Sequence, residues 1–387
     1  MKYSARSAVD DAPSPLALAL EASRATRPDV IDLTVSNPTR VGLSYAAYEG
    51  VLGTRAALDY SPDPLGLASA RQAVSRHWPG HGVRPDPDDV LLLPSSSEAY
   101  HYVFTLLGDV GDEVLAPEPS YPLLSHLARY AGITLVPYRL LYDGAWHIDL
   151  DSVRRAQGPR SRAIILISPN NPTGSYTSQA ELDALAQLGL PLVSDEVFAR
   201  YDLEPERKKP LSAYAATPRL TFCIDGLSKS AGLPQVKLSW LALSGPPEQT
   251  REAMRRLSWI ADTFLSVATP IQQLLPGLLE RSEGFRGALC ERLAHNLGSL
   301  RAALAGSAAT LLACQGGWYA VVRLPDLASE EEWVLGLASS AGVMTHPGHF
   351  YDFHDAAPYL VLSLLQEPEA FARGALAIRR EVDARAR

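Results

Sequence analysis

Short apolar runs alternate with longer stretches of helical periodicity through the middle of the chain. Most runs are apolar at consecutive positions, which is typical of strands covered on both faces in a parallel sheet. The predicted strands are DVLLLP (89–94), EVLAP (113–117), ITLVPY (133–138), AIILISP (163–169), PLVSDE (191–196), LTFCIDG (220–226) and LSWLALS (238–244). The pattern predicts a large α/β domain over residues 45–285, with a mostly parallel central sheet flanked by helices.

After Gly284 the pattern changes to long amphipathic stretches with fewer strand candidates. The predicted helices lie at 285–306, 329–341 and 367–386, and the predicted strands at 318–325 and 359–365. This mixture indicates a smaller α+β domain made of residues 1–44 and 286–387, on which a helix at 14–25 is expected to pack.

Composition narrows the class of protein. The 387 residues are 47% hydrophobic and 20% charged, which is enough to build a sizeable core. With 35 Lys+Arg against 43 Asp+Glu, the net charge of −8 argues against a general binder of nucleic acid or anionic membranes. The three cysteines fit neither a disulfide framework nor a zinc site, and no apolar stretch is long enough for a signal peptide or a membrane span. A soluble, cytoplasmic protein is expected.

Ligands of open α/β sheets bind beyond the carboxyl ends of the strands, so the loops after the predicted strands are the places to search. The first of these loops contains Ser95, Ser96 and Ser97 at the start of a helical stretch. Hydroxyl groups, free backbone N–H groups and the helix dipole together favour a phosphate there. Ordinary helix capping, which needs only one serine, is the alternative.

Two further loops carry polar groups. The turn SPNNPTG (168–174) holds an amide side chain at its rim, although a structural turn alone also explains the sequence. Asp195 stands where a hydrophobic strand stops, and a carboxylate there is costly unless it meets a cation or a protonated ring nitrogen. The alternative for the acidic segment is a helix N-cap.

The fourth loop, GLSKSAG (226–232), places Lys229 between small residues, with a second cation at Lys237. A partly desolvated amine has a lowered pKa and can form a Schiff base, whereas an exposed lysine would do neither. With Tyr121 as an aromatic platform, the four loops provide a phosphate cradle, an amide, an acid and a nucleophilic amine. Pyridoxal 5′-phosphate is the small molecule that needs this set.

The sequence resembles the fold type I pyridoxal-phosphate enzymes, specifically the class I/II aminotransferases, over nearly its whole length. The matching motifs are SNPT (36–39), YSPDPLGLASARQAV (60–74), SSSEA (95–99), GDEVLAPEPSYP (111–122), SPNNPTG, SDEVF (194–198), GLSKSAGLPQVKLSW (226–240), GGWYAVVRLP (316–325) and THPGHFYDF (345–353).

The resemblance implies a role for each candidate residue. Lys229 would carry the cofactor covalently and move the proton of the substrate Cα, and Asp195 would keep the pyridine nitrogen protonated. Asn171 would hydrogen-bond the phenolic oxygen and Tyr121 would stack on the ring. The implied phosphate ligands are Ser95, Ser96, Ser97, Ser228 and Lys237, with Tyr60 reaching the phosphate of a neighbouring subunit. A homodimer with shared active sites follows, to which residues 263–270 would also contribute.

Three positions depart from the family pattern. Phe198 stands where the family usually has a tyrosine that donates to the phenolic oxygen, so we expect a higher pKa for the lysine-bound cofactor than in relatives with the tyrosine. Lys237 replaces an arginine and keeps a charge for the phosphate without its bidentate geometry. Val361 stands where the family has the arginine that clamps the substrate carboxylate.

A valine cannot pair with a carboxylate, so another group must bind it or the substrate differs. Arg40 is the leading substitute, with a solvated loop arginine as the alternative, and Asn37 in the SNPT motif is a second substrate candidate. His346 and His349 are weaker candidates because histidine is charged only part of the time near neutral pH. Trp318 and Tyr319 are expected to be packing residues near the domain junction, with substrate contact as the alternative.

The predicted function is transfer of an amino group between an amino acid and a 2-oxo acid by a ping-pong mechanism. The loss of arginine at Val361 leaves open a lyase, decarboxylase or oxidase of the same fold and cofactor. No metal is expected.

Overall fold

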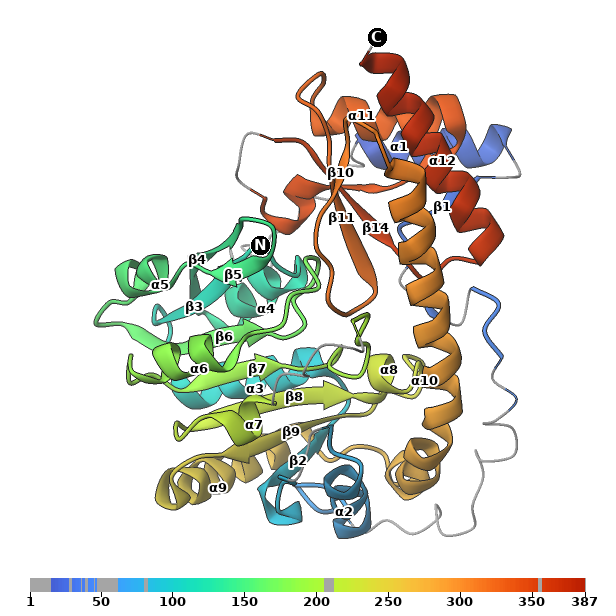
Figure 1. Ribbon diagram of the computed structural model, residues 1–387. Helices are drawn as coiled ribbons and strands as arrows, with labels where there is room; N and C mark the ends of the chain where they lie inside the picture. Colours follow the sequence, from blue (N-terminus) through green and yellow to red (C-terminus); the bar gives the residue numbers. More distant parts are fainter. Residues whose placement is uncertain are drawn as a thin grey trace, which may run out of the picture.

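A computed structural model of the chain describes residues 15–27, 30–35, 37–38, 41–44, 46, 62–79, 83–204, 212–353 and 357–386. Its two largest sheets lie one above the other, and one long helix runs beside both (Figure 1).

The larger sheet has eight strands in the order β2-β9-β8-β7-β6-β3-β4-β5. The strands are β2 (Val90–Leu93), β3 (Glu113–Glu118), β4 (Thr134–Tyr142), β5 (Trp146–Ile148), β6 (Ser161–Ile167), β7 (Leu192–Asp195), β8 (Thr221–Gly226) and β9 (Ser239–Ser244). Its middle pairs, from β4 through β3, β6 and β7 to β8, are parallel, while β5 and β9 run antiparallel to their neighbours. The mostly parallel sheet predicted from the apolar runs is confirmed.

Helices cover both faces of this sheet, which explains why its strands are apolar at successive positions. In β2, for example, Leu91 and Leu93 join one buried cluster while Val90 and Leu92 join the other. The helices are α2 (Ala68–Arg76), α3 (Ser96–Leu107), α4 (Leu123–Ala131), α5 (Leu150–Ala156), α6 (Gln179–Ala186), α7 (Ala213–Ala216), α8 (Leu227–Ser230) and α9 (Pro247–Phe264), with the short turn η5 (Pro87–Asp89).

The smaller sheet is antiparallel, in the order β10-β11-β14-β13. Its strands are β10 (Thr310–Leu311), β11 (Tyr319–Arg323), β13 (His346–Pro347) and β14 (Tyr359–Ser363), and β1 (Ile31–Asp32) pairs separately with β12 (Val343–Met344). The surrounding helical segments are α1 (Pro15–Thr26), α11 (Glu330–Gly336), η6 (Leu337–Ala341), η7 (Gly348–Tyr351) and α12 (Pro368–Arg385). As predicted, the first helix packs here, and the Ser23 hydroxyl donates to the Ala338 carbonyl.

One helix, α10 (Thr269–Leu304), extends beside both sheets (Figure 1). It contains the predicted border between residues 45–285 and 286–387, so that division of the chain into domains stays a prediction. No helix in the described ranges is both long and apolar enough to cross a membrane.

Candidate active site

Lys229 lies in the short helix α8, directly after β8. Its ε-amino nitrogen is 4.9 Å from the ring centre of Trp318 and 5.6 Å from that of Phe198. The Tyr201 hydroxyl donates a hydrogen bond to the Lys229 carbonyl and so holds the turn. Burial lowers the pKa of Lys229 to about 8, against the opposing effect of Asp195 and with a small further lowering by Lys237. A substantial neutral fraction near physiological pH makes the amine a nucleophile.

Asp195 ends β7, the strand next to β8. The carboxylate is buried and accepts hydrogen bonds from the Tyr100 hydroxyl (2.9 Å) and the Val197 N–H (3.2 Å). Burial raises its pKa to about 6, although both hydrogen bonds and Lys229 favour the ionised form. Since both hydrogen-bond donors are uncharged, a cationic ring nitrogen brought beside this carboxylate would stabilise it as the anion.

The turn after β6 contains two asparagines, Asn170 and Asn171, whose side chains have different surroundings. Asn170 accepts from the Thr173 N–H and hydroxyl at 3.2 and 2.9 Å, and so holds the turn together. The neighbouring Asn171 is buried, yet its Oδ1 has no hydrogen-bond partner among the described residues. Gly174 allows the turn to approach Gly316, whose N–H donates to the Gly174 carbonyl at 2.9 Å. The structure therefore supports both interpretations of this segment, a tight turn and an available amide.

The predicted phosphate ligands meet at one end of the sheet. Leu93 pairs with Ser239, and Ser239 pairs with Gly226, so the segments that carry Ser95, Ser228 and Lys237 leave the sheet side by side. The Ser95 hydroxyl accepts from the Glu98 N–H at 3.1 Å and caps α3. The capping alternative is thus correct for this hydroxyl, which engages the Glu98 N–H. The N–H groups of Ser96 and Ser97 at the helix start are the ones that could bind an anion.

Tyr121 follows β3 and is half-buried beside the same site. Burial, with smaller effects of Asp195 and Tyr319, raises its pKa to about 12, so the ring is a neutral phenol. The structure thus brings Tyr121 and Asp195 close together.

Two residues that sequence reasoning missed complete the surroundings, Tyr100 as a donor to Asp195 and Tyr201 as a donor to Lys229. Tyr100 stands one helical turn after Ser96, but this spacing alone does not identify Asp195 as its partner.

Two of the residues that depart from the family pattern are buried in apolar surroundings. Phe198 is buried and its ring packs edge-on against Trp318 with centres 5.3 Å apart. Val361 is fully buried in β14. Trp318 and Tyr319 are buried and pack against Phe198, and the Trp318 ring also borders the Lys229 amine. Asn37 is exposed, and Tyr60 and Arg40 lie outside the described residues.

The fold is that of the type I aminotransferases. The structure matches an alanine aminotransferase from Pyrococcus furiosus with a TM-score of 0.88 and 22% identity, over 99% of this chain and 100% of that one. The family model "Aminotransferase class I and II" matches residues 29–357. The chain therefore belongs to the class I and II aminotransferase family.

Two curated relatives match over shorter stretches. The glutamate-pyruvate aminotransferase AlaA of Escherichia coli K12 is 30% identical over 221 residues, which is 55% of this chain and 54% of that protein. The S-alkyl-thiohydroximate lyase SUR1 of Arabidopsis thaliana is 29% identical over 235 residues, 58% of this chain and 50% of that protein. The matched part thus spans about half the length of these relatives.

Proposed function

We propose that the protein is a pyridoxal-phosphate-dependent aminotransferase that moves an amino group between an amino acid and a 2-oxo acid. The observation that carries the proposal is the Lys229 amine of lowered pKa, set beside Asp195 at the ends of adjacent parallel strands. Two features of the site fit the cofactor. The Asn171 amide is buried and its Oδ1 has no partner among the described residues, so this side chain is not committed to holding the turn. The donors to the Asp195 carboxylate within the described part of the chain are uncharged.

Each residue then has a task in holding the cofactor. Lys229 would attach to the aldehyde, Asp195 would pair with the ring nitrogen and Asn171 would donate a side-chain N–H to the phenolic oxygen. Tyr121 covers the ring. The phosphate is held by the first turn of α3 (Ser95, Ser96, Ser97), with Ser228, Lys237 and, from a neighbouring subunit, Tyr60. When bound, the cofactor supplies an electron sink for negative charge at the substrate Cα.

The residues around Lys229 suit the movement of a proton. Its pKa of about 8 lets the amine both accept and release a proton near neutral pH. Phe198 and Trp318 border the amine with apolar rings, which keep water from the proton and hold the side chain in place. Tyr201 fixes the backbone from which the side chain extends.

Glutamate and pyruvate are the first substrates to test, because the relative AlaA bears their names. We propose that transfer proceeds by a ping-pong mechanism, and that the protein is cytoplasmic.

We also propose a homodimer with shared sites. Gln272 of α10 accepts from the Leu67 N–H at 2.6 Å and donates to the Val267 carbonyl, so one side chain ties the loop before α2 to the segment 263–270, which we expect to serve a neighbouring subunit. Nearby, Trp259, Phe264 and Leu265 are 69%, 52% and 69% exposed and present an apolar surface that a second copy could cover.

A second candidate, a lyase with the same cofactor, is favoured by Val361 in place of the expected arginine and by the similarity to SUR1. A lyase would expel a group from the substrate side chain instead of transferring the amino group.

A single-turnover experiment separates the two functions. Purified protein loaded with pyridoxal phosphate is mixed with single amino acids, and absorbance follows the conversion of the cofactor to its amine form. Accumulation of that form with one equivalent of 2-oxo acid supports transfer. Release of ammonia and an oxo acid without the amine form would show that the lyase proposal is the correct one.

A further inference from the structure

The proposed function leaves open which group binds the α-carboxylate of an amino-acid substrate, and the following inference rests on that function. The side chain at position 361 is apolar and fully buried. A hydrogen-bond donor for the substrate carboxylate must therefore come from another residue, and residues on the same face of the smaller sheet are the nearest candidates.

The strand register places His346 directly beside Val361. In the antiparallel ladders, His346 on β13 and Val321 on β11 are both paired with Val361 on β14. Residues opposite each other in such ladders point to the same face, and so do residues two apart in one strand. Tyr319, two positions before Val321, therefore also shares this face. His346 thus lies directly beside position 361, and Tyr319, which is paired with Ser363, lies diagonally across from it.

Ring contacts connect this face to Lys229. The Lys229 amine lies 5.6 Å from the Phe198 ring centre, and the Phe198 and Tyr319 ring centres are 6.3 Å apart. From there, Tyr319 and Tyr351 are 6.4 Å apart, and Tyr351 and His346 are 6.0 Å apart.

The backbone also anchors this group to the site. The Ser120 N–H, one residue before Tyr121, donates to the Tyr351 carbonyl at 2.9 Å. This bond ties Tyr351, and through its hydroxyl His346, to the segment that carries Tyr121.

A hydrogen bond sets the orientation of the imidazole. The Tyr351 hydroxyl and His346 Nδ1 are 3.1 Å apart. Burial raises the pKa of Tyr351 well above its usual value, so the phenol keeps its proton to donate. Burial lowers the pKa of His346, against a smaller opposite effect of Asp32, and so favours the neutral ring, which can accept that proton at Nδ1. The other nitrogen, Nε2, then carries the N–H.

We propose that His346, oriented by Tyr351, binds the α-carboxylate of the substrate through its Nε2–H, in place of an arginine at position 361. The other sequence candidate among the histidines is already engaged, since His349 Nδ1 lies 2.9 Å from the Glu330 carboxylate. A neutral donor in place of a fixed positive charge also implies weaker binding of simple amino acids and a larger share of binding from the substrate side chain.

The test compares L-alanine with L-alaninamide, which lacks the carboxylate, in the single-turnover assay on cofactor-loaded protein. His346→Phe should raise the half-saturating concentration of alanine about 10- to 100-fold, the range expected for a lost hydrogen bond to a charged group. The value for alaninamide should change by less than about threefold, because its amide depends less on this donor. His346→Gln, which keeps an N–H donor, should retain most of the alanine affinity.

Two additional variants protect the test against loss of folding. Tyr351→Phe removes only the hydroxyl that orients the imidazole and should raise the half-saturating concentration of alanine several-fold. Val361→Arg added to His346→Phe should restore alanine saturation. Calorimetric binding of 2-methylalanine, which has no Cα hydrogen to lose, gives the same comparison without turnover.

The inference is overturned if His346→Phe binds alanine as the wild type does, or if alanine and alaninamide are affected equally. It is also overturned if Arg40→Ala weakens alanine binding and His346→Phe does not. Failure of the wild-type protein to take up the cofactor would instead contradict the proposed function.

Discussion

Burial acts on the two central residues in opposite directions. It lowers the pKa of Lys229 to about 8 and raises that of Asp195 to about 6, because a low-dielectric site disfavours either charge. The pKa values of Asp195 and Lys229 therefore lie closer together than in water, and both lie near neutral pH. Without a ligand, an ionised Asp195 is therefore a cost to the folded state.

This cost predicts that Asp195→Asn stabilises the cofactor-free protein. A carboxyl whose folded pKa is about 6, against about 3.8 when unfolded, favours folding below pH 4 and loses that contribution as pH rises through 6. At pH 7.5 the variant should unfold with a free energy about 1–3 kcal/mol higher than wild type, and the difference should vanish near pH 4. Denaturant titrations across this pH range measure it, and the variant should bind pyridoxal phosphate more weakly.

Asp112→Asn is the matched control, with the opposite sign. The Arg162 guanidinium bonds Asp112 at 2.8 and 3.0 Å and lowers the pKa of that carboxyl. The variant should be less stable than wild type at pH 7.5, and the loss should shrink as the pH falls through the folded pKa. If Asp195→Asn destabilises the apoprotein in the same way, the assignment of Asp195 as a strained acid is wrong.

At the residue scale, sequence reasoning located the polar groups that stand directly after strands. The small residues around Lys229 and the abrupt end of the strand at Asp195 were visible as local anomalies. Tyr100 and Tyr201 were not, because an aromatic residue in a helix or loop reads as packing until a partner distant in sequence is known. Their contacts with Asp195 and Lys229 arise only from the tertiary fold.

At the element scale, the turn at 168–174 depends on a glycine. Gly174 has φ +71°, and a Cβ there would lie 2.6 Å from the Gly316 carbonyl oxygen. Gly174→Ala should therefore lower the free energy of unfolding by about 2–4 kcal/mol and weaken cofactor binding by displacing Asn171. Gly189→Ala, with φ +81° and open space around it, is the control and should cost only about 1 kcal/mol. Equal losses in the two variants would show that the close approach is unimportant.

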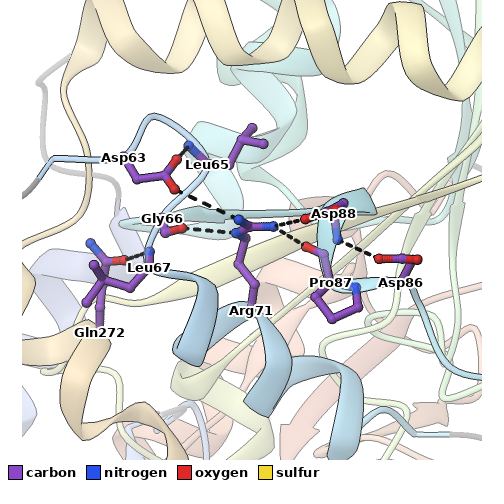
Figure 2. Close-up of polar contacts among 9 residues, drawn as sticks. All are labelled: Asp63, Leu65, Gly66, Leu67, Arg71, Asp86, Pro87, Asp88 and Gln272. Atoms are coloured by element: carbon purple, nitrogen blue, oxygen red, sulfur yellow. Dashed lines mark hydrogen bonds and ion pairs between the residues drawn. The ribbon is translucent and has the colours of Figure 1, made fainter.

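A second element-scale prediction concerns the loop before α2 (Figure 2). Arg71 is buried and donates to the Gly66 carbonyl (3.0 Å), the Pro87 carbonyl and the Asp88 carboxylate (3.0 Å), which ties this loop to η5. Arg71→Ala would leave buried carbonyls unpaired and should lower the unfolding free energy by about 2–4 kcal/mol. Arg76→Ala, at an exposed site on the same helix, should change it by less than about 0.5 kcal/mol. A similar effect of both variants would rule out the buried network as the cause.

The elements that the sequence predicted correctly are those with a long and distinct hydrophobic pattern. All seven apolar runs of the large domain became strands, because strands covered on both faces carry an unbroken signal. The two- and three-residue strands β1, β5, β10, β12 and β13 were missed, because so few residues show no recognisable pattern. Helix α9 was also missed, although its buried positions Thr250, Ala253, Met254, Leu257 and Ala261 follow helical spacing.

At the scale of the whole molecule, the exposed apolar surface at the end of α9 predicts self-association. Trp259→Glu places a charge on that surface and should raise the dimer dissociation constant at least about tenfold, because buried tryptophans dominate interface energies. Leu376→Glu on α12, at a position that is 50% exposed, should leave it unchanged. Sedimentation velocity over a concentration series measures both, and a wild-type protein that is monomeric throughout would contradict the shared-site dimer.

The sequence predicted the central sheet more directly than the long helix that runs beside both sheets. Apolar runs and their order predicted the central sheet, but no local pattern could show that α10 starts at Thr269 and continues past both sheets. Pro276 interrupts the helical signal inside α10, and the packing of the helix on α2 and α12 outweighs its effect.

The central claim, that Lys229 carries the cofactor, is tested most directly by covalent mapping. The chain has only five lysines, at positions 2, 208, 209, 229 and 237. After incubation with pyridoxal phosphate and reduction with borohydride, peptide mass spectrometry should find one pyridoxyl group per chain on Lys229, and none in Lys229→Ala. A label on Lys237 or spread over the other lysines, or a protein that takes up no cofactor, would contradict the account.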